Sequence, residues 1–378
     1  MLFWDNLKGL KIDMTQILIQ ENKDNKKIAL VEDGQIIEYY EEDNETSRKE
    51  GNIYIGIVKD IIKGMQSAFV DIGTEKNSFI HLKDVLPKID ETKQKNDETI
   101  DIASVLQPNQ KILVQVKKDS NEKKGARVST HINLPSKYIV LMPNTDIITI
   151  SQKIEDKKEQ ERLIKLVKDN LDKNNGAIIR TSAQGKEKEI IEDIKYIQKK
   201  WNDIIQTSID PNQNKPKLLY KSEDIVEKIL IDLVEKEIQI KKGKDLFEED
   251  DIKKQLEKLN DRKIWLKCGG FITIDKTEAL TAIDVNTGKY TGKNNLDQTV
   301  YKVNKEATME IAKQLRLRDI GGIIIIDYID MNSREDKEKI EELLKQELKK
   351  DRTKTQVEGF TKLDLIEMTR KHICSHKE

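Results

Sequence analysis

The sequence predicts a multidomain protein of the α+β class. The chain has 378 residues, which is enough for two to four domains with separate cores. Short apolar segments that alternate and are bounded by glycines predict strands, whereas longer segments with apolar residues at helical spacing predict amphipathic helices. Two apolar segments carry an aspartate in or at the end of the run, Asp284 and Asp327.

Charged residues and hydrophobic residues each make up 36% of the chain, so we expect a folded protein with a heavily charged surface. The net charge of −1 argues against a uniformly basic nucleic-acid binder, although a local basic groove is compatible with it. No signal peptide and no apolar run of the ~20 residues that a membrane span needs are visible. The two cysteines, Cys268 and Cys374, indicate no disulfide framework and fit a reducing cytoplasm.

The first domain is predicted from residues 1–46, where segments 14–19, 27–31 and 34–39 read as strands of a small sheet. This sheet needs a partner from elsewhere in the chain. Residues 47–131 predict a compact β-barrel, because five short strands are separated by glycines at bends and turns. The strands that we expect are 53–58, 66–72, 78–81, 111–116 and 126–130.

Five short strands of this kind indicate an OB fold, which binds single-stranded nucleic acid on one face. Phe69 and Phe79 would stack on bases there, with Lys124 near a phosphate. The alternative is that both phenylalanines belong to the barrel core. The polar segment 88–107 interrupts the barrel and reads as a loop.

Residues 132–217 differ from the barrel segment because strands alternate with helices. Strands are predicted at 138–143 and 176–181, and amphipathic helices at 157–170 and 187–205. Arg180 and Thr181 end the second strand and could form a phosphate pocket, because a guanidinium offers a fork of donors. A surface ion pair is the alternative for this dipeptide.

Residues 218–270 are predicted to be rich in helix at 225–238, with a charged, solvated segment at 241–260 and a hairpin at 264–275. In the last domain, 271–378, the segment 282–286 predicts a strand that stops at Gly288. The segment 321–327 predicts a buried strand entered through a glycine pair, and a helix follows at 334–350.

Carboxylates at the ends of two strands could converge on one divalent cation, with Asn286 beside the first. For each aspartate alone, a turn or cap role is the alternative. No histidine lies between Asp284 and Asp327, which disfavours a histidine general base. A metal with two carboxylates stabilises charge on phosphorus and lowers the pKa of a bound water, so water attack leaving a 5′ phosphate and a 3′ hydroxyl is expected.

The residues that carry these aspartates resemble a known family. Residues 277–288 (TEALTAIDVNTG) and residues 311–322 continuing to 327–331 (DYIDM) closely resemble the catalytic signature of the ribonuclease E/G family. Weaker resemblance follows in the family's order at 67–73, 141–144, 180–181 and 365–370, so it covers nearly the whole chain.

The resemblance implies a fold. Residues 1–46 and 218–270 would form an RNase H-like subdomain, into which an OB-fold domain (47–131) and a 5′-sensor domain (132–217) are inserted. Residues 271–378 would form a DNase I-like catalytic domain. The resemblance also implies an Mg²⁺-dependent endoribonuclease that cleaves A/U-rich single-stranded RNA in rRNA and tRNA processing and in mRNA decay.

The resemblance assigns roles to matching residues. Asp284 and Asp327 correspond to the metal-binding carboxylates, and Asn286 to the residue that holds the first carboxylate or contacts the scissile region. The remaining matches are to RNA-contacting positions, at Phe69, Phe79 and Lys124, and to the pocket that senses a 5′ monophosphate, at Arg180, Thr181 and Lys354. Lys354 stands where the family has arginine, which keeps the charge but loses the bidentate fork.

The sequence ends at residues 374–378 without the C-P-x-C pair that in many members binds zinc between two chains. His372, Cys374 and His376 are spaced too weakly to predict zinc. The family's C-terminal oligomerisation domain and a disordered scaffold tail are not expected either, and a homodimer remains open. Two other function classes compete with the nuclease: a non-catalytic RNA-binding protein with a vestigial acidic pair, and a metal-dependent phosphatase, which would leave the barrel unexplained.

Overall fold

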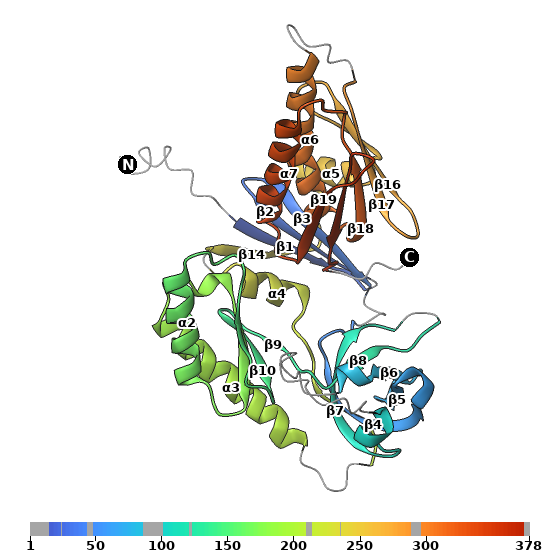
Figure 1. Ribbon diagram of the computed structural model, residues 1–378, viewed down its shortest axis with the longest axis vertical. Helices are drawn as coiled ribbons and strands as arrows, with labels where there is room; N and C mark the ends of the chain where they lie inside the picture. Colours follow the sequence, from blue (N-terminus) through green and yellow to red (C-terminus); the bar gives the residue numbers. More distant parts are fainter. Residues whose placement is uncertain are drawn as a thin grey trace. The chain divides into compact units, whose positions relative to one another are not determined.

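The structure is a computed structural model that describes residues 15–23, 25–43, 48–85, 101–120, 123–208, 214–234, 236–288 and 296–373. Two compact units make up the chain. Unit 1 combines residues 1–46 with residues 236–378, and unit 2 is residues 47–235, so unit 2 is an insertion in the sequence of unit 1. Helices and strands occur in both, as Figure 1 shows, which confirms the predicted α+β class.

Unit 2 begins with a closed, five-stranded, OB-like barrel. The strands close into a ring in the order β4-β5-β6-β8-β7, because β4 pairs with both β5 and β7. Alternate residues such as Val58, Val70 and Val114 fill the barrel core. A further strand, β13 (Lys217–Tyr220), pairs with β4, and a short helix, α1 (Ile102–Val105), contacts it. The barrel strands are β4 (Ile53–Ile62), β5 (Ser67–Asp71), β6 (Ser78–His81), β7 (Lys111–Lys118) and β8 (Arg127–Ser129).

The rest of unit 2 is a small sheet covered by helices. Its strands are β9 (Leu134–Pro135), β10 (Ile139–Pro143), β11 (Ile148–Ile150) and β12 (Asn175–Ile179), and its helices are α2 (Lys157–Asn170) and α3 (Lys188–Ser208). A further helix of unit 2, α4 (Ile225–Asp232), comes later in the chain. Helix α2 begins after Asp156, whose carboxylate accepts the N–H of Lys158 and caps the helix. The apolar faces of α2 and α3 meet the sheet in one core that includes Leu163, Ile194 and Trp201.

Ser222, from the later part of unit 2, is hydrogen-bonded to residues near the start of that unit. The Ser222 hydroxyl donates to the carbonyl of Glu50 at 2.8 Å, and its N–H donates to the side chain of Asn52 at 2.8 Å.

Unit 1 contains two sheets, of which the first joins the N-terminal strands to a later one. Its order is β14 (Ile238–Lys242), β1 (Thr15–Glu21), β2 (Asn25–Glu32) and β3 (Gln35–Asp43). Ile17 of β1 stands opposite Ile240 of β14 in a parallel pair, so the expected partner does come from 218–270. The segment 241–260 was predicted to be solvated. This is wrong in part, because Phe247 and, in helix α5 (Asp250–Glu257), Ile252 are buried against this sheet.

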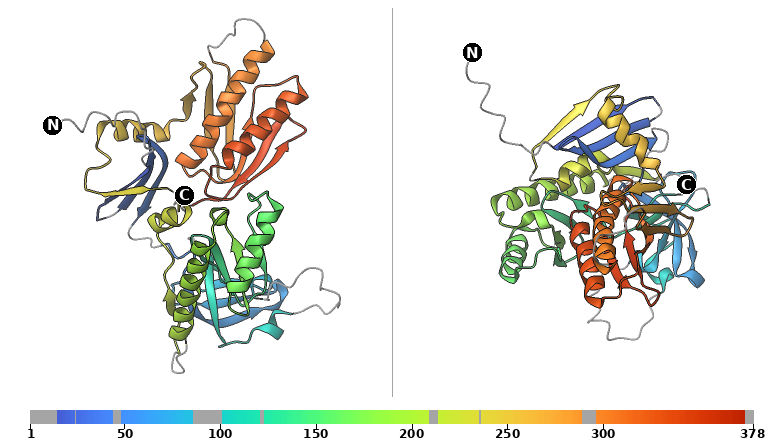
Figure 2. Two further views of the ribbon diagram at one scale, coloured as in Figure 1. Left: turned by 90° about the vertical axis from the view of Figure 1, so that its left-hand side faces the viewer. Right: turned by 90° about the horizontal axis from the view of Figure 1, so that it is seen from above.

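The second sheet of unit 1 has six strands and carries the two aspartates. Its order is β15 (Lys263–Trp265), β16 (Phe271–Lys276), β17 (Thr281–Asn286), β18 (Gly322–Asp327), β20 (Leu365–Arg370) and β19 (Thr355–Phe360). Strands β17 and β18 are parallel and connected through helix α6 (Leu296–Leu317). Helix α7 (Arg334–Leu348) packs beside α6, as both views in Figure 2 show.

One face of this sheet packs against α6 and α7 in a single core, which includes Ile283, Ile324 and Ile326 of the strands and Ile311 and Leu344 of the helices. The sequence predicted that 321–327 is buried throughout. The strand instead alternates, because Ile323 on the other side is 51% exposed. We call that other side the open face.

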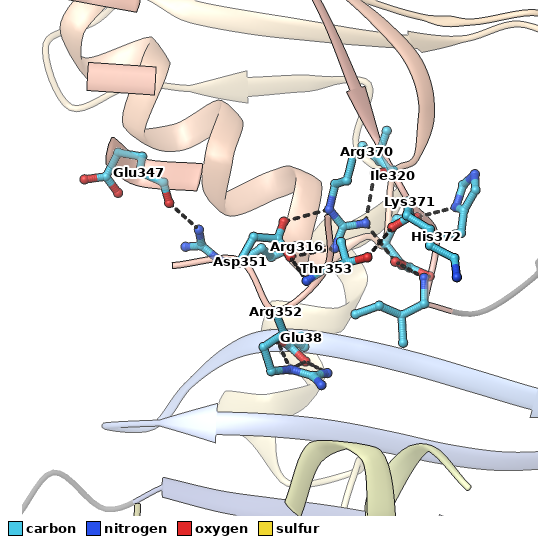
Figure 3. Close-up of polar contacts among 12 residues, drawn as sticks. Glu38, Arg316, Ile320, Glu347, Asp351, Arg352, Thr353, Arg370, Lys371 and His372 are labelled. Atoms are coloured by element: carbon cyan, nitrogen blue, oxygen red, sulfur yellow. Dashed lines mark hydrogen bonds and ion pairs between the residues drawn. The ribbon is translucent and has the colours of Figure 1, made fainter. Parts of the chain in front are cut away.

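Buried ion pairs join the parts of unit 1 (Figure 3). Arg370 at the end of β20 donates to Asp351 at 2.7 Å and to Asp319 at 2.8 Å, and the three side chains have exposed fractions of 0 to 1%. Arg352, next to Asp351, donates to Glu38 of β3 at 2.9 Å. This network connects the two sheets of unit 1 by charge-assisted hydrogen bonds. Within the part of the chain described here, no helix is long and apolar enough to cross a membrane.

Candidate active site

Asp284 and Asp327 lie directly opposite each other on neighbouring parallel strands. They form the last register pair of β17 and β18, after Ile283 opposite Ile326. The isoleucines point into the core, so the alternation of a strand sends both aspartates to the open face, where both are exposed. The sequence predicted this convergence, and the structure brings the two carboxylates together.

The two aspartates line an open depression with a volume of about 310 Å³ at the carboxyl ends of these strands. Its other polar groups come from the residues that follow each strand. Asn286 donates its side-chain N–H to the Asp284 carboxylate at 2.5 Å, which fixes the orientation of that carboxylate. The lining residues are Asp284, Val285, Asn286, Thr287, Asp327, Tyr328, Ile329 and Asp330.

Negative charge accumulates in this depression. The pKa of Asp327 is raised, first by partial burial and then by the charges of Asp284 and Asp330. A cation bound between these carboxylates would remove the repulsion and favour their ionised forms. Arg262 makes a bidentate ion pair with Asp275. The pKa of Arg262 is raised mainly by Asp275 and to a smaller extent by the charge of Asp284.

The oxygen ligands fit Mg²⁺ better than zinc. Mg²⁺ typically takes one or two carboxylates and keeps several waters, which matches two opposed aspartates in an open depression. Among the described residues, no group of three or more His, Cys, Asp or Glu side chains is arranged to hold a metal ion. Of the three residues weighed for zinc, His372 contacts the carbonyl of Asp319 at 2.9 Å through Nδ1, while Cys374 and His376 lie outside the described residues.

The aromatic residues predicted to contact RNA are paired on the barrel surface. Phe69 and Phe79 are cross-strand neighbours with ring centroids 6.3 Å apart at 70°, and both are half-buried. Neighbours such as Val70 and Ile80 point into the core instead, so the alternative that both phenylalanines are core residues is not what the structure has.

Lys124 is exposed, and the residues that follow it lie beside the strand of Phe79. The next residue, Gly125, passes so near Asn77 that a Cβ there would lie 1.9 Å from the Asn77 carbonyl oxygen. Phe79 donates its N–H to the carbonyl of Ala126 at 2.7 Å. The chain segment that carries Lys124 is therefore fixed beside the strand that carries Phe79.

Arg180 and Thr181 have partners within unit 2. Arg180 forms an ion pair with Asp232 and donates to the carbonyl of Ser136 at 2.8 Å, so the ion-pair alternative describes its contacts. The Thr181 hydroxyl lies 3.0 Å from that of Ser151. Lys354 belongs to unit 1, where it is exposed and its carbonyl accepts the N–H of Lys371. Their role in 5′-phosphate sensing stays a prediction.

Sequence reasoning missed several residues around the aspartates. Asp330 lines the depression. Phe271 lies on β16, next to β17, and Lys263 and Trp265 lie on β15, the strand beyond it. The sequence did contain a sign of the aromatic residues. Ile264 and Ile272 face the core, so the residues that alternate with them, Trp265 and Phe271, must lie on the open face.

Comparison with known proteins gives the chain a family. Residues 133–241 and 235–373 match the profile of the Ribonuclease E/G family. Ribonuclease G of Escherichia coli (strain K12) is 36% identical over 390 residues, which cover 94% of this chain and 79% of that protein. Ribonuclease G of Haemophilus influenzae is 36% identical over 95% of this chain and 80% of its own length. Ribonuclease E of Nostoc sp. (strain PCC 7120) is 34% identical over 92% of this chain and 56% of its own length. With this length of similarity and its opposed aspartates, the chain belongs to the Ribonuclease E/G family.

Proposed function

We propose that this protein is an endoribonuclease that hydrolyses single-stranded RNA with Mg²⁺ at Asp284 and Asp327. The observation that carries the proposal is the register pair of these two aspartates, with Asn286 holding the first. The ribonuclease names of the relatives agree with it. We further propose that the protein cleaves A/U-rich substrates and leaves products with a 5′ phosphate and a 3′ hydroxyl. Its proposed roles are in rRNA and tRNA processing and mRNA decay in the cytoplasm.

The residues of the site suggest a division of labour. Asp284 and Asp327 would hold Mg²⁺ through their carboxylate oxygens, and Asn286 would keep Asp284 in the orientation that binding needs. Bound Mg²⁺ supplies a Lewis acid for a phosphoryl oxygen and lowers the pKa of water. Burial and the charges of Asp284 and Asp330 raise the pKa of Asp327, and a bound cation would favour its ionised form.

Further residues would bind the substrate away from the cleaved bond. Phe69 and Phe79 offer ring faces to bases, and Lys124 offers a charge to the backbone. Arg180, Thr181 and Lys354 are proposed to sense a 5′ monophosphate. Because Arg180 already pairs with Asp232, a phosphate would have to compete with that carboxylate.

The proposed architecture follows the family. We propose that residues 1–46 and 218–270 form an RNase H-like subdomain, residues 47–131 an OB-fold domain, residues 132–217 a 5′-sensor domain and residues 271–378 a DNase I-like catalytic domain. A homodimer is part of the proposal, to be tested by the mass in solution with and without a chelator.

A cleavage assay tests the function. The substrate is a 5′-monophosphorylated, A/U-rich single strand, and the reaction is followed with Mg²⁺ and with EDTA. We expect Asp284→Asn and Asp327→Asn to lose cleavage but to keep RNA binding, measured by fluorescence anisotropy. Asp364→Asn is the matched control, because Asp364 is a turn residue with φ +60° and tolerates asparagine. End mapping of the products identifies the bond that breaks.

Each outcome decides between the readings. Normal cleavage by either aspartate variant contradicts the two-carboxylate site. RNA binding without cleavage by the unaltered protein supports a non-catalytic RNA-binding protein, and release of inorganic phosphate without internal cleavage supports a phosphatase.

A further inference from the structure

Two aromatic rings lie on the open face at the edge of the sheet that carries the aspartates. Trp265 on β15 is 57% exposed, and Phe271 on β16 is half-buried beside it. Their ring centroids are 5.3 Å apart at 61°, an edge-to-face arrangement. A tryptophan this exposed on a regular strand contributes little to the core, whose residues on this hairpin are Leu266 and Ile272.

A lysine of the same strand lies over both rings. The Lys263 ammonium is 4.2 Å from the Trp265 ring centroid and 3.6 Å from the Phe271 ring centroid. Cation–π attraction at these distances orients the amine and keeps its charge on the open face. Lys263, Trp265 and Phe271 therefore form one cationic, aromatic cluster, which we call the aromatic platform.

The strand register connects this platform to the acidic pair. Trp265 stands opposite Phe271, which stands opposite Asn286. In the neighbouring cross-strand row, Lys263 stands opposite Thr273, Thr273 opposite Asp284, and Asp284 opposite Asp327. Neighbouring strands are ~4.8 Å apart, so Phe271 lies about one strand spacing and Trp265 about two from the strand that carries Asp284 and Asn286.

The chemistry of the platform selects its occupant. Exposed aromatic rings beside a cation stack on nucleobases, while the cation attracts the phosphate backbone. The carboxylates themselves repel a phosphate, so a cation in the Asp284 row helps a strand of RNA to cross the face. A protein partner would use the rings alone and has no need of a lysine in register with the acidic pair.

We propose that Trp265, Phe271 and Lys263 form a base-stacking subsite for the nucleotide next to the phosphodiester that is cleaved at Asp284 and Asp327. This inference rests on the proposed function and adds to it a contact made by the catalytic sheet itself. Stacking accepts every base but favours larger ring systems, so a purine at this one position is the preferred occupant.

Steady-state kinetics on the full chain test the subsite. Loss of one stacked base is expected to raise KM for the A/U-rich oligonucleotide about 5- to 150-fold for Trp265→Ala. Trp265→Phe keeps a ring and should recover most of that loss. Leu363→Ala is the matched control, because Leu363 is an 80% exposed apolar residue on a turn away from the platform, and its KM should not change.

A binding probe gives a readout that is independent of catalysis. In the Asp327→Asn background, RNAs with 2-aminopurine at successive positions should show fluorescence quenching at one position, and Trp265→Ala should remove it. Cleavage by the unaltered chain with KM and quenching unchanged in Trp265→Ala overturns the subsite while leaving the proposed function intact. Absence of cleavage by the unaltered chain overturns the function instead. A change of mass in solution with Trp265→Ala, with KM unchanged, identifies the platform as a contact between copies and also overturns the subsite.

Discussion

Replacing Arg370 by methionine should strongly destabilise unit 1. The guanidinium is fully buried and donates to Asp351, Asp319 and the carbonyl of Ile320. Burial lowers the pKa of Arg370, but the hydrogen bonds and charges of Asp351 and Asp319 outweigh it, so the pKa is raised overall. Methionine of similar length removes the cation and leaves two buried carboxylates uncompensated.

The expected cost follows from these contacts. Removing one partner of a buried ion pair costs about 3–5 kcal/mol, and two stranded carboxylates put this variant near the upper end. Each carboxylate keeps one backbone donor, from Ile373 to Asp319 and from Thr353 to Asp351, so the loss stays within that range. A triple variant that adds Asp319→Asn and Asp351→Asn removes the uncompensated charges and should recover at least half of the loss.

Hydrogen exchange measured by mass spectrometry is the assay, because it reports each unit separately. Peptides from β18 and β20 should exchange roughly two to four orders of magnitude faster in Arg370→Met, while those from α3 in unit 2 provide an internal reference. Arg334→Met is the matched control, because Arg334 is 93% exposed and its surface pair contributes at most about 0.5 kcal/mol. Exchange of β18 and β20 within tenfold of the unaltered protein would refute the reasoning, and so would equal acceleration in α3.

Three more predictions concern charge and folding. Asp330→Asn removes one of the charges that raise the pKa of Asp327. The acid limb of the pH profile of kcat/KM should therefore shift to lower pH, and an unshifted acid limb would contradict the reasoning. Because the pKa of Asp327 is higher in the folded than in the unfolded chain, its charged form costs stability above that pKa and none below the unfolded value. Asp327→Asn should therefore raise the melting temperature in metal-free buffer at neutral pH, and the gain should vanish in acid; a constant gain at every pH is the contrary result. Residues 47–235 alone should unfold cooperatively in urea, because Ser222 closes that unit on Glu50, whereas a gradual transition argues against autonomy.

The sequence was most informative where alternation and periodicity were strong. The barrel strands, helix α3 and the strand of Asp284 each have a regular apolar pattern that predicted their structure. Asp284 and Asp327 could be predicted to converge because parallel strands bring their carboxyl ends to one edge. Family resemblance named the same residues, and the register pair supplied their physical proximity.

Other features depend on partners that are distant in the sequence. Strand β14 is short and its ends fell in a predicted helix, 225–238, and a predicted solvated segment, 241–260, and only its pairing with β1 shows it to be a strand. Arg180 pairs with Asp232, which no local pattern indicates. Alternation in the hairpin indicates the face on which Trp265 and Phe271 lie, but their position opposite each other and beside Asn286 follows only from the strand register.

The pairing of β1 with β14 has a consequence for synthesis on the ribosome. Roughly 220 residues separate Glu21 from Ile238, so at ~5–20 residues per second the outer edge of β1 waits about 10–40 s for its partner. Unit 2 emerges during that interval and can close through Ser222 before unit 1 is complete. The nascent chain therefore carries a finished inner unit and an open strand edge at the same time, and that edge is the place where mispairing with other chains would begin.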